Sequence, residues 1–364
     1  MKSSLSEQRR WRSFAGLFLG AAAAMFSVLF GFVVLLDPFG LRVGRGDAPR
    51  PLMDLNQRYM YPQLVRSGRF DAAILGTSTM RLIDPARLSS EAAGRFVNLA
   101  MNAATPWEQT QMAGLFARLT ARPSAVIWGV DATWCEADAT QDAKRLTPRP
   151  FPPWLYDAPR WTDWGNLLSL TTLEIGGRLL GYRLGLMRER IRGDGYEVFT
   201  PPEASYDLDR AREHLWGGVS AYPAASNEGP QPAAPVPGAA VRAAWRFPAL
   251  AWLDGSLAAL PATTVKLIVL PPVHISAQFR PGTLAGQRHA ACIAALGEVA
   301  ASRGAAIIDY GFASPLTSDD SNFWDRLHFR LPVARRVEAD LGAVLAGRAP
   351  ASADGAIRIA PSTR

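Results

Sequence analysis

The longest uninterrupted apolar pattern in the chain lies near its N-terminus. No charged residue occurs from Ser13 to Leu36, where the sequence reads SFAGLFLGAAAAMFSVLFGFVVLL. At a rise of about 1.5 Å per residue, about 20 helical residues cross the roughly 30 Å of hydrocarbon in a bilayer. We therefore predict one transmembrane helix over residues 13–36.

The charges that flank this helix predict its orientation. Four basic side chains lie in residues 1–12: Lys2, Arg9, Arg10 and Arg12. By the positive-inside rule the N-terminus is cytoplasmic, so we expect a single-pass protein of a bacterial inner membrane with a periplasmic body. A cleavable signal peptide usually has a shorter apolar stretch of about 7–15 residues, which favours an uncleaved anchor.

Short β-rich runs alternate with helical patterns beyond a connector over residues 37–65. Five strands are predicted: DAAILG from Asp71, RFVNLAM from Arg95, SAVIWGVD from Ser124, VKLIVLPP from Val265 and AAIIDYG from Ala305. This alternation is typical of a parallel sheet covered by helices. We expect an α/β domain over residues 66–347.

Three helices in this domain have clear boundaries. Thr105, Pro106 and Glu108 form a capping box with proline at the first helical position, which predicts a helix to about Thr120. A second helix is predicted over about residues 284–303, with Gly304 as its C-cap. A third is predicted over about residues 332–347.

A long insertion, about residues 136–260, separates the third strand from the fourth. Its tryptophans either pack in a core or stack on sugar rings: Trp154, Trp161, Trp164, Trp216, Trp245 and Trp252. A predicted helix over residues 166–192 mixes leucines with arginines. It either packs on the body with a solvated basic face or lies on anionic headgroups. The tail, residues 348–364, is predicted to be disordered.

Composition excludes several classes of protein. With 48% hydrophobic residues the chain can form a packed core, and its net charge of +7 owes much to the N-terminal cluster. No finger or RNA-binding signature is present, so we expect no nucleic-acid partner. Cys135 and Cys292 are too few for a disulfide-rich scaffold. A single disulfide is compatible with the periplasm, but two buried free thiols are the simpler interpretation.

The first predicted strand ends in LGTSTMR, which places Ser78 two residues after Gly76. Ligands of parallel sheets bind at this carboxyl edge of the strands. A serine hydroxyl is a weak nucleophile until a histidine accepts its proton. Ser78 is therefore a candidate nucleophile that needs a histidine from elsewhere in the chain.

One of the four histidines lies where such a base is needed. His328 follows Asp325 by three residues in NFWDRLHFR, between the last predicted strand and the last predicted helix. This spacing lets the carboxylate accept from one ring nitrogen while the other nitrogen faces the serine. We predict a catalytic set of Ser78, Asp325 and His328.

These motifs, G-T-S at 76–78 and D-R-L-H at 325–328, resemble those of the SGNH (GDSL-like) hydrolase superfamily, over roughly residues 71–345 with the insertion unmatched. A membrane helix before such a body is also similar to DltD-type proteins, which work on D-alanyl esters of cell-wall polymers, and to periplasmic factors for polysaccharide O-acetylation. The resemblance implies a flavodoxin-like three-layer parallel sheet preceded by one transmembrane helix. It implies the roles of nucleophile for Ser78, base for His328 and orienting partner for Asp325.

The two remaining blocks of the superfamily match less well. In the second, Ala103 stands where a glycine amide would donate to the oxyanion, and Asn102 beside it offers a side-chain donor. In the third, usually G-x-N-D, Asp131 replaces the asparagine, and an ionised carboxylate cannot donate. Either Asp131 is protonated, or Thr133 or Asn102 substitutes, or the site stabilises an oxyanion poorly. Losing one donor typically costs about 2.7–4 kcal/mol of transition-state stabilisation.

Two further residues lie near the predicted edge. His274, after the fourth strand, either contacts substrate or is a hydrogen-bonded loop histidine. Arg81, after the serine turn, either binds an anionic group or pairs with a carboxylate. No metal-ligand spacing or glycine-rich phosphate loop is present, so we expect no metal and no cofactor.

These patterns predict a membrane-anchored periplasmic serine esterase or acyltransferase that acts on acyl esters, with acetyl favoured, of a cell-envelope glycan. The expected partners are an envelope polysaccharide, the inner membrane through residues 13–36, and a membrane-bound acyltransferase. The alternative is a catalytically inactive SGNH-like protein that binds glycan or scaffolds a membrane-bound acyltransferase in polysaccharide assembly. Asp131 and Ala103 would then mark a decayed oxyanion hole.

Overall fold

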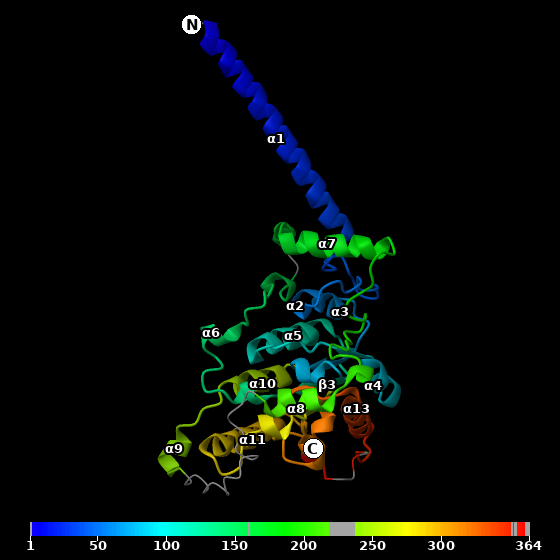
Figure 1. Cartoon of the computed structure of the whole chain (residues 1–364), viewed down its shortest axis with the longest axis vertical. Helices are drawn as coiled ribbons and strands as arrows, with labels where there is room; N and C mark the ends of the chain where they lie inside the picture. The colour runs from blue at the N-terminus through cyan, green and yellow to red at the C-terminus, as the bar shows by residue number, and fades with distance from the viewer. Residues whose placement is uncertain (1, 159–160, 218–236, 351, 353–354, 361–364) are drawn as a thin grey trace.

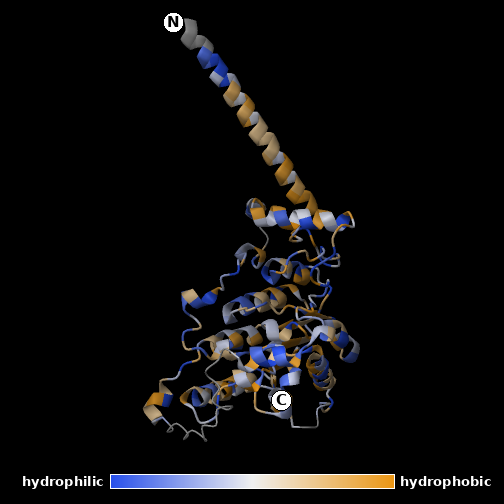
Figure 2. Cartoon of the chain, viewed as in Figure 1, coloured by the Kyte–Doolittle hydropathy of each residue, from blue (hydrophilic) through white to orange (hydrophobic). Residues whose placement is uncertain are grey.

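A single long helix projects from a folded body in the computed structural model, which describes residues 2–158, 161–217, 237–350, 352 and 355–360 (Figure 1). This helix, α1 (Lys2–Leu36), includes the basic segment that precedes the predicted span. Its colouring changes from hydrophilic to hydrophobic along its length (Figure 2). By length and composition α1 can cross a membrane, as predicted. Its last turn enters the body, where Val33 and Leu36 are buried.

The body is built on a six-stranded sheet with the strand order β2-β1-β3-β4-β5-β6. The five predicted strands are all present: β1 (Ala72–Leu75), β2 (Phe96–Asn98), β3 (Ala125–Gly129), β4 (Val265–Leu270) and β5 (Ala306–Asp309). They pair in parallel, with Ile74 opposite both Asn98 and Ile127. The predicted α/β class with a largely parallel sheet is confirmed.

The sixth strand, β6 (Arg358–Ala360), corrects the prediction of a disordered tail. It pairs antiparallel with β5, with Arg358 opposite Asp309. The segment has little hydrophobic pattern, but the open edge of β5 offers a row of backbone donors and acceptors. Ser352 also hydrogen-bonds to the buried Asp340. Residues 351, 353–354 and 361–364 of the predicted tail lie outside the described residues.

Helices cover both faces of the sheet. One face packs against α5 (Pro106–Leu119), α10 (Ala249–Ala258) and α11 (Leu284–Ser302), and the other against α4 (Pro85–Glu91) and α13 (Leu331–Leu345). Side chains along a strand point alternately to the two faces, so Ala73 and Leu75 join one core while Ala72 and Ile74 join the other. The predicted helix boundaries hold closely, and Thr105 and Glu108 form the capping box at the start of α5.

The connector, the loop after β3 and the insertion add shorter elements around this body. These are α2 (Gln57–Met60), α3 (Pro62–Arg66), η2 (Ala132–Cys135), α6 (Asp142–Arg145), η3 (Pro153–Leu155), η4 (Trp161–Leu167), α7 (Leu170–Arg183), η5 (Glu203–Ser205), α8 (Leu208–Trp216) and α9 (Ala239–Ala243).

The helix predicted over 166–192 is shorter than expected, because the chain turns at Gly185 and residue Ile191 bridges to Leu52. Trp154, Trp164 and Trp252 pack against the core.

Cys135 and Cys292 form a disulfide, so the interpretation of two free thiols was wrong. The residues are 157 positions apart in sequence, which hides their proximity. Packing of α11 against η2 brings their Cα atoms to 5.7 Å. The bond therefore ties the loop after β3 to the helix layer on one face of the sheet.

Candidate active site

Ser78 lies in a tight turn directly after β1. It is the first residue of the short helix η1 (Ser78–Met80) and is partly exposed. The turn requires Gly76, which has φ +142°, a value that disfavours any residue with a side chain. A Cβ at this position would lie 2.7 Å from Cγ of Met80. The local backbone therefore presents the serine at the carboxyl edge of the sheet, as predicted.

Asp325 and His328 lie on a small hairpin between η7 (Asp320–Asn322) and α13. Phe323 and Phe329 bridge its base, and the amide of Trp324 donates to the carbonyl of His328 at 2.9 Å. Both phenylalanines are buried in the core below. These two buried side chains therefore anchor the hairpin on the core.

The structure brings the three predicted residues together. Oγ of Ser78 lies 2.9 Å from Nε2 of His328, and Nδ1 of His328 lies 2.7 Å from Oδ2 of Asp325. The amides of Leu327 and His328 donate to Oδ1 of Asp325 at 2.8 and 2.9 Å. The side chains of Asp325 and His328 remain 40% and 23% exposed, so solvent and substrate can reach them.

The surroundings of Asp325 favour its ionised form. Burial alone would raise the pKa of this carboxyl group, but hydrogen bonding and charge attraction from His328, with the two loop amides, outweigh it and lower the pKa below the ordinary value. An ionised Asp325 accepts the Nδ1 proton, which leaves Nε2 free to accept the proton of the Ser78 hydroxyl. The set has the geometry of a nucleophile and its base.

The loop with Asn102 and Ala103 lies beside the serine turn. The amide of Met101 donates to the carbonyl of Gly76 at 3.0 Å, which aligns the two loops. Ala103 has φ +51°, in the left-handed region that favours glycine. Within the described part of the chain the amides of Ser78 and Ala103 donate no hydrogen bond, so both remain available as donors.

The side chains of Asp131 and Thr133 are hydrogen-bonded to each other. Oδ1 of Asp131 accepts from the amide and the hydroxyl of Thr133, at 3.0 and 2.5 Å, and Oδ2 accepts from Thr77 at 3.1 Å. The Thr133 hydroxyl already donates to Asp131, so its role as an oxyanion donor stays a prediction. Burial raises the pKa of Asp131, although these hydrogen bonds oppose the shift. Asp131 acts as the N-cap of η2.

His274 is a buried structural residue. Its ring nitrogens contact Ser276 at 2.8 Å and Asp320 at 3.2 Å, and the side chain is fully enclosed. The prediction that it contacts substrate is wrong, because Trp216 and Phe323 cover the ring. The alternative, a hydrogen-bonded loop histidine, is confirmed. Burial lowers the pKa of His274 and so favours its neutral form.

Arg81 pairs with a carboxylate, the second of its two predicted roles. It forms an ion pair with Glu197, and its guanidinium carbon lies 4.4 Å from the centre of the Phe199 ring. The ring of Phe199 in turn packs against His328 in a T-shaped arrangement. Both Glu197 and Phe199 belong to the insertion, which therefore forms one wall of the site.

The insertion also braces the hairpin that carries His328. Glu203 accepts from Arg330 at 2.9 and 2.6 Å, directly after the hairpin. Asp320, directly before it, accepts from Arg212 and Trp216 of α8 at 3.0 Å each. These contacts could not be predicted from the sequence, because partners more than 100 positions apart leave no spacing signal.

Within the described ranges, no group of three or more histidine, cysteine or acidic side chains could hold a metal ion. No protein-family model, curated protein or solved structure matches this chain.

Proposed function

We propose that this protein is a membrane-anchored serine esterase or acyltransferase of the SGNH type that acts on small acyl esters of a cell-envelope glycan. The observation that carries the proposal is the Ser78–His328–Asp325 set, with both hydrogen bonds formed. The order of the parallel strands, β2-β1-β3-β4-β5, supports the flavodoxin-like assignment.

The chemistry follows from this geometry. Ser78 Oγ attacks the ester carbonyl carbon while its proton moves to Nε2 of His328, and Asp325 stabilises the resulting imidazolium. The imidazolium returns the proton to the departing alcohol as the tetrahedral intermediate collapses to an acyl-serine. Water or a sugar hydroxyl then attacks the acyl-serine and gives its proton to His328. Transfer of that proton to Ser78 releases the acid or the new ester.

The free amides of Ser78 and Ala103 are the proposed oxyanion donors. The side chain of Asn102, on the same loop, is a third candidate. Two backbone amides suffice for an oxyanion hole in other serine hydrolases, so Asp131 does not by itself argue against catalysis.

The proposed periplasmic location has independent support. A disulfide such as Cys135–Cys292 forms and persists in oxidising compartments and is rare in the cytosol. This agrees with the basic N-terminal segment lying on the cytoplasmic side.

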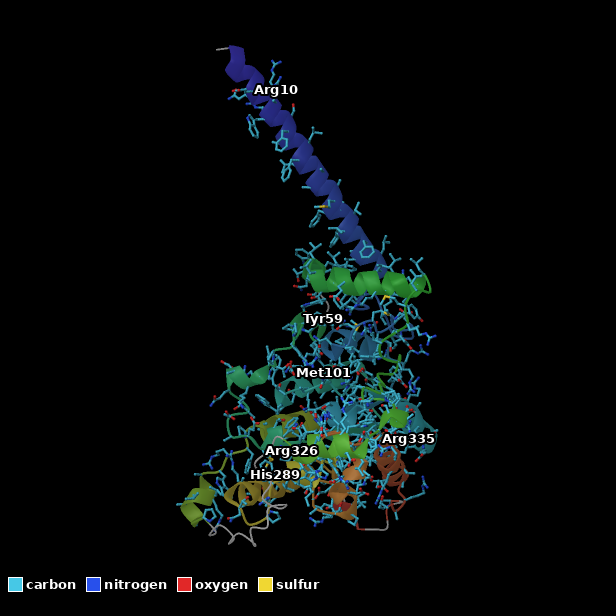
Figure 3. All side chains as sticks on the ribbon, viewed as in Figure 1. Arg10, Tyr59, Met101, His289, Arg326 and Arg335 are labelled. Carbon is cyan, nitrogen blue, oxygen red and sulfur yellow. A yellow bond between two sulfur atoms is a disulfide. The ribbon has the colours of Figure 1, made fainter. Side chains whose placement is uncertain are left out.

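A soluble or extended substrate suits the position of the site. Arg326, next to Asp325, lies farther from α7 and the end of α1 than Tyr59 and Met101 do (Figure 3). The catalytic hairpin is therefore held away from the proposed membrane surface, where a polymer of the envelope can reach it and a lipid chain cannot easily do so.

The test is covalent labelling of the full chain in detergent with an activated acetyl ester, followed by mass spectrometry of the peptide that contains Ser78. We expect an added acetyl group on Ser78 and none in Ser78→Ala. Ser276→Ala is the matched control, because Ser276 lies against the buried His274. A folded protein that neither labels nor turns over ester, but binds glycan equally with and without Ser78, would support the non-catalytic alternative.

A further inference from the structure

We infer that residues 161–187, here called the interface segment, lie flat on the lipid surface where α1 leaves the bilayer. The segment comprises η4, α7 and the turn after it. The inference rests on membrane insertion of α1, which is part of the proposed function, and does not depend on the catalytic chemistry.

The segment is attached to the end of α1. In Figure 1, α7 lies across the base of α1, between that helix and the rest of the body. Its buried face contains Thr172, Ile175, Gly176 and Leu179. Gly176 permits a close approach, since a Cβ there would lie 3.1 Å from the Phe32 ring.

This contact lies at the depth expected for the membrane surface. From Ser13, where the charge-free stretch begins, to Phe32 there are about 20 residues, which at about 1.5 Å each span about 30 Å. That length is the thickness of the hydrocarbon layer, so α7 meets α1 at its outer boundary.

The segment exposes an unusual amount of apolar surface. Eight of the large hydrophobic side chains that are exposed on the described part of the body fall within it: Trp161, Leu168, Leu170, Leu180, Tyr182, Leu184, Leu186 and Met187. Leu170 is 86% exposed, and helical spacing places it opposite the buried face of α7. Leu184, the C-cap at the other end of α7, is 63% exposed. Exposed apolar surface of this kind is unfavourable in water and favourable in the interfacial layer of a bilayer.

Arginines accompany these leucines, as in helices that lie in the interface. Arg183 lies in the segment, and Arg188 and Arg190 follow directly after it; all three are exposed, and their side chains form no ion pair with any described residue. Their long side chains can reach lipid phosphates while the leucines enter the acyl region. Arg178, by contrast, is held by Asp54 and Glu174. A bilayer is the occupant that fits, because α1 continues from this surface into the membrane.

Two attachment points have a mechanical consequence. A single helix would let the body rotate and tilt about α1. The interface segment would remove this freedom and keep the catalytic hairpin at a defined height above the membrane.

Spin labels on the full chain in lipid nanodiscs test the inference. The discs contain phosphatidylethanolamine and phosphatidylglycerol, and each variant carries one introduced cysteine, Leu170→Cys or Leu184→Cys, since the native cysteines are paired. Accessibility to oxygen and to a water-soluble nickel chelate gives the depth of the label. Val28→Cys, 70% exposed on α1, is the control in lipid, and Leu284→Cys, 55% exposed on the body, is the control in water.

We expect labels at 170 and 184 to favour oxygen, as at 28, and the label at 284 to favour the nickel chelate. Labels at 170 and 184 that behave like the one at 284, with 28 still in lipid, would overturn the inference alone. Protection from both reagents at 170 and 184 would also overturn it, because a protein would then cover the segment. A water-exposed label at 28 would instead refute the anchor.

Discussion

The ring of Phe199 meets the imidazole of His328 edge to face, with ring centroids 5.2 Å apart. The same ring lies under the guanidinium of Arg81, three residues after Ser78. A single side chain of the insertion therefore contacts both the residue at the end of the serine turn, Arg81, and the histidine of the candidate site. The insertion is therefore part of the candidate site and not an appendage to it.

Replacing Phe199 should impair turnover without unfolding the protein. Aromatic pairs contribute about 0.5–1.5 kcal/mol, so we expect Phe199→Ala to lower kcat/KM for an acetyl ester by up to about tenfold. Phe279→Ala is the matched control, since Phe279 stacks on His289 at 4.6 Å on a different part of the body. Equal effects of the two variants would contradict a positioning role for Phe199.

Removing the charge of Asp325 should affect the rate far more than the fold. Asp325→Asn can no longer stabilise the imidazolium or select the tautomer with a proton on Nδ1, so we expect kcat to fall by about 10²- to 10⁴-fold. Asp319→Asn, in the preceding turn, tests for a local structural effect. Steady-state kinetics with circular dichroism would separate the two. Near wild-type kcat in Asp325→Asn would argue against the triad.

The raised pKa of Asp131 predicts a pH-dependent stability. A folded-state pKa above the unfolded value means that the folded protein binds the proton more tightly. The contribution of Asp131 to stability is therefore full at acidic pH and is lost as the pH rises through its folded-state pKa. Asp131→Asn should raise Tm at pH 7, by about 2–4 °C for each kcal/mol recovered.

Thermal unfolding in detergent between pH 4 and pH 8 would check this. The gain in Asp131→Asn should shrink as the pH falls toward about 4, the ordinary carboxyl pKa. Asp142→Asn, at a side chain that is 91% exposed, should show no such trend. A gain of constant size at every pH would mean that burial of the charge is not its cause.

The disulfide should contribute measurably to stability, because it closes a long loop in the unfolded chain. We expect the double variant Cys135→Ala, Cys292→Ala to lose about 2–4 kcal/mol of unfolding free energy in urea. Adding reductant to the wild-type protein should reproduce the loss, whereas the variant should not respond. If neither treatment changes the urea midpoint, the packing of α11 on η2 is sufficient without the bond.

Local patterns determined much of this protein. The charge-free stretch predicted the apolar part of α1 and its end at Leu36, the β-rich runs predicted β1 to β5, and the capping box at Thr105 predicted the start of α5. Hydrophobic periodicity and backbone capping act over a few residues, so a sequence shows them directly. The pairing of Ser78 with His328 could also be predicted, because the carboxyl ends of parallel strands share one edge.

The tertiary structure decided what depends on contacts between distant segments. Packing joined Cys135 to Cys292, the open edge of β5 ordered β6, and a shell of aromatic rings enclosed His274. The wall formed by Glu197 and Phe199 is of the same kind, since its partners lie in other parts of the chain. Such contacts follow from how layers stack in space, and no residue spacing along the chain encodes them.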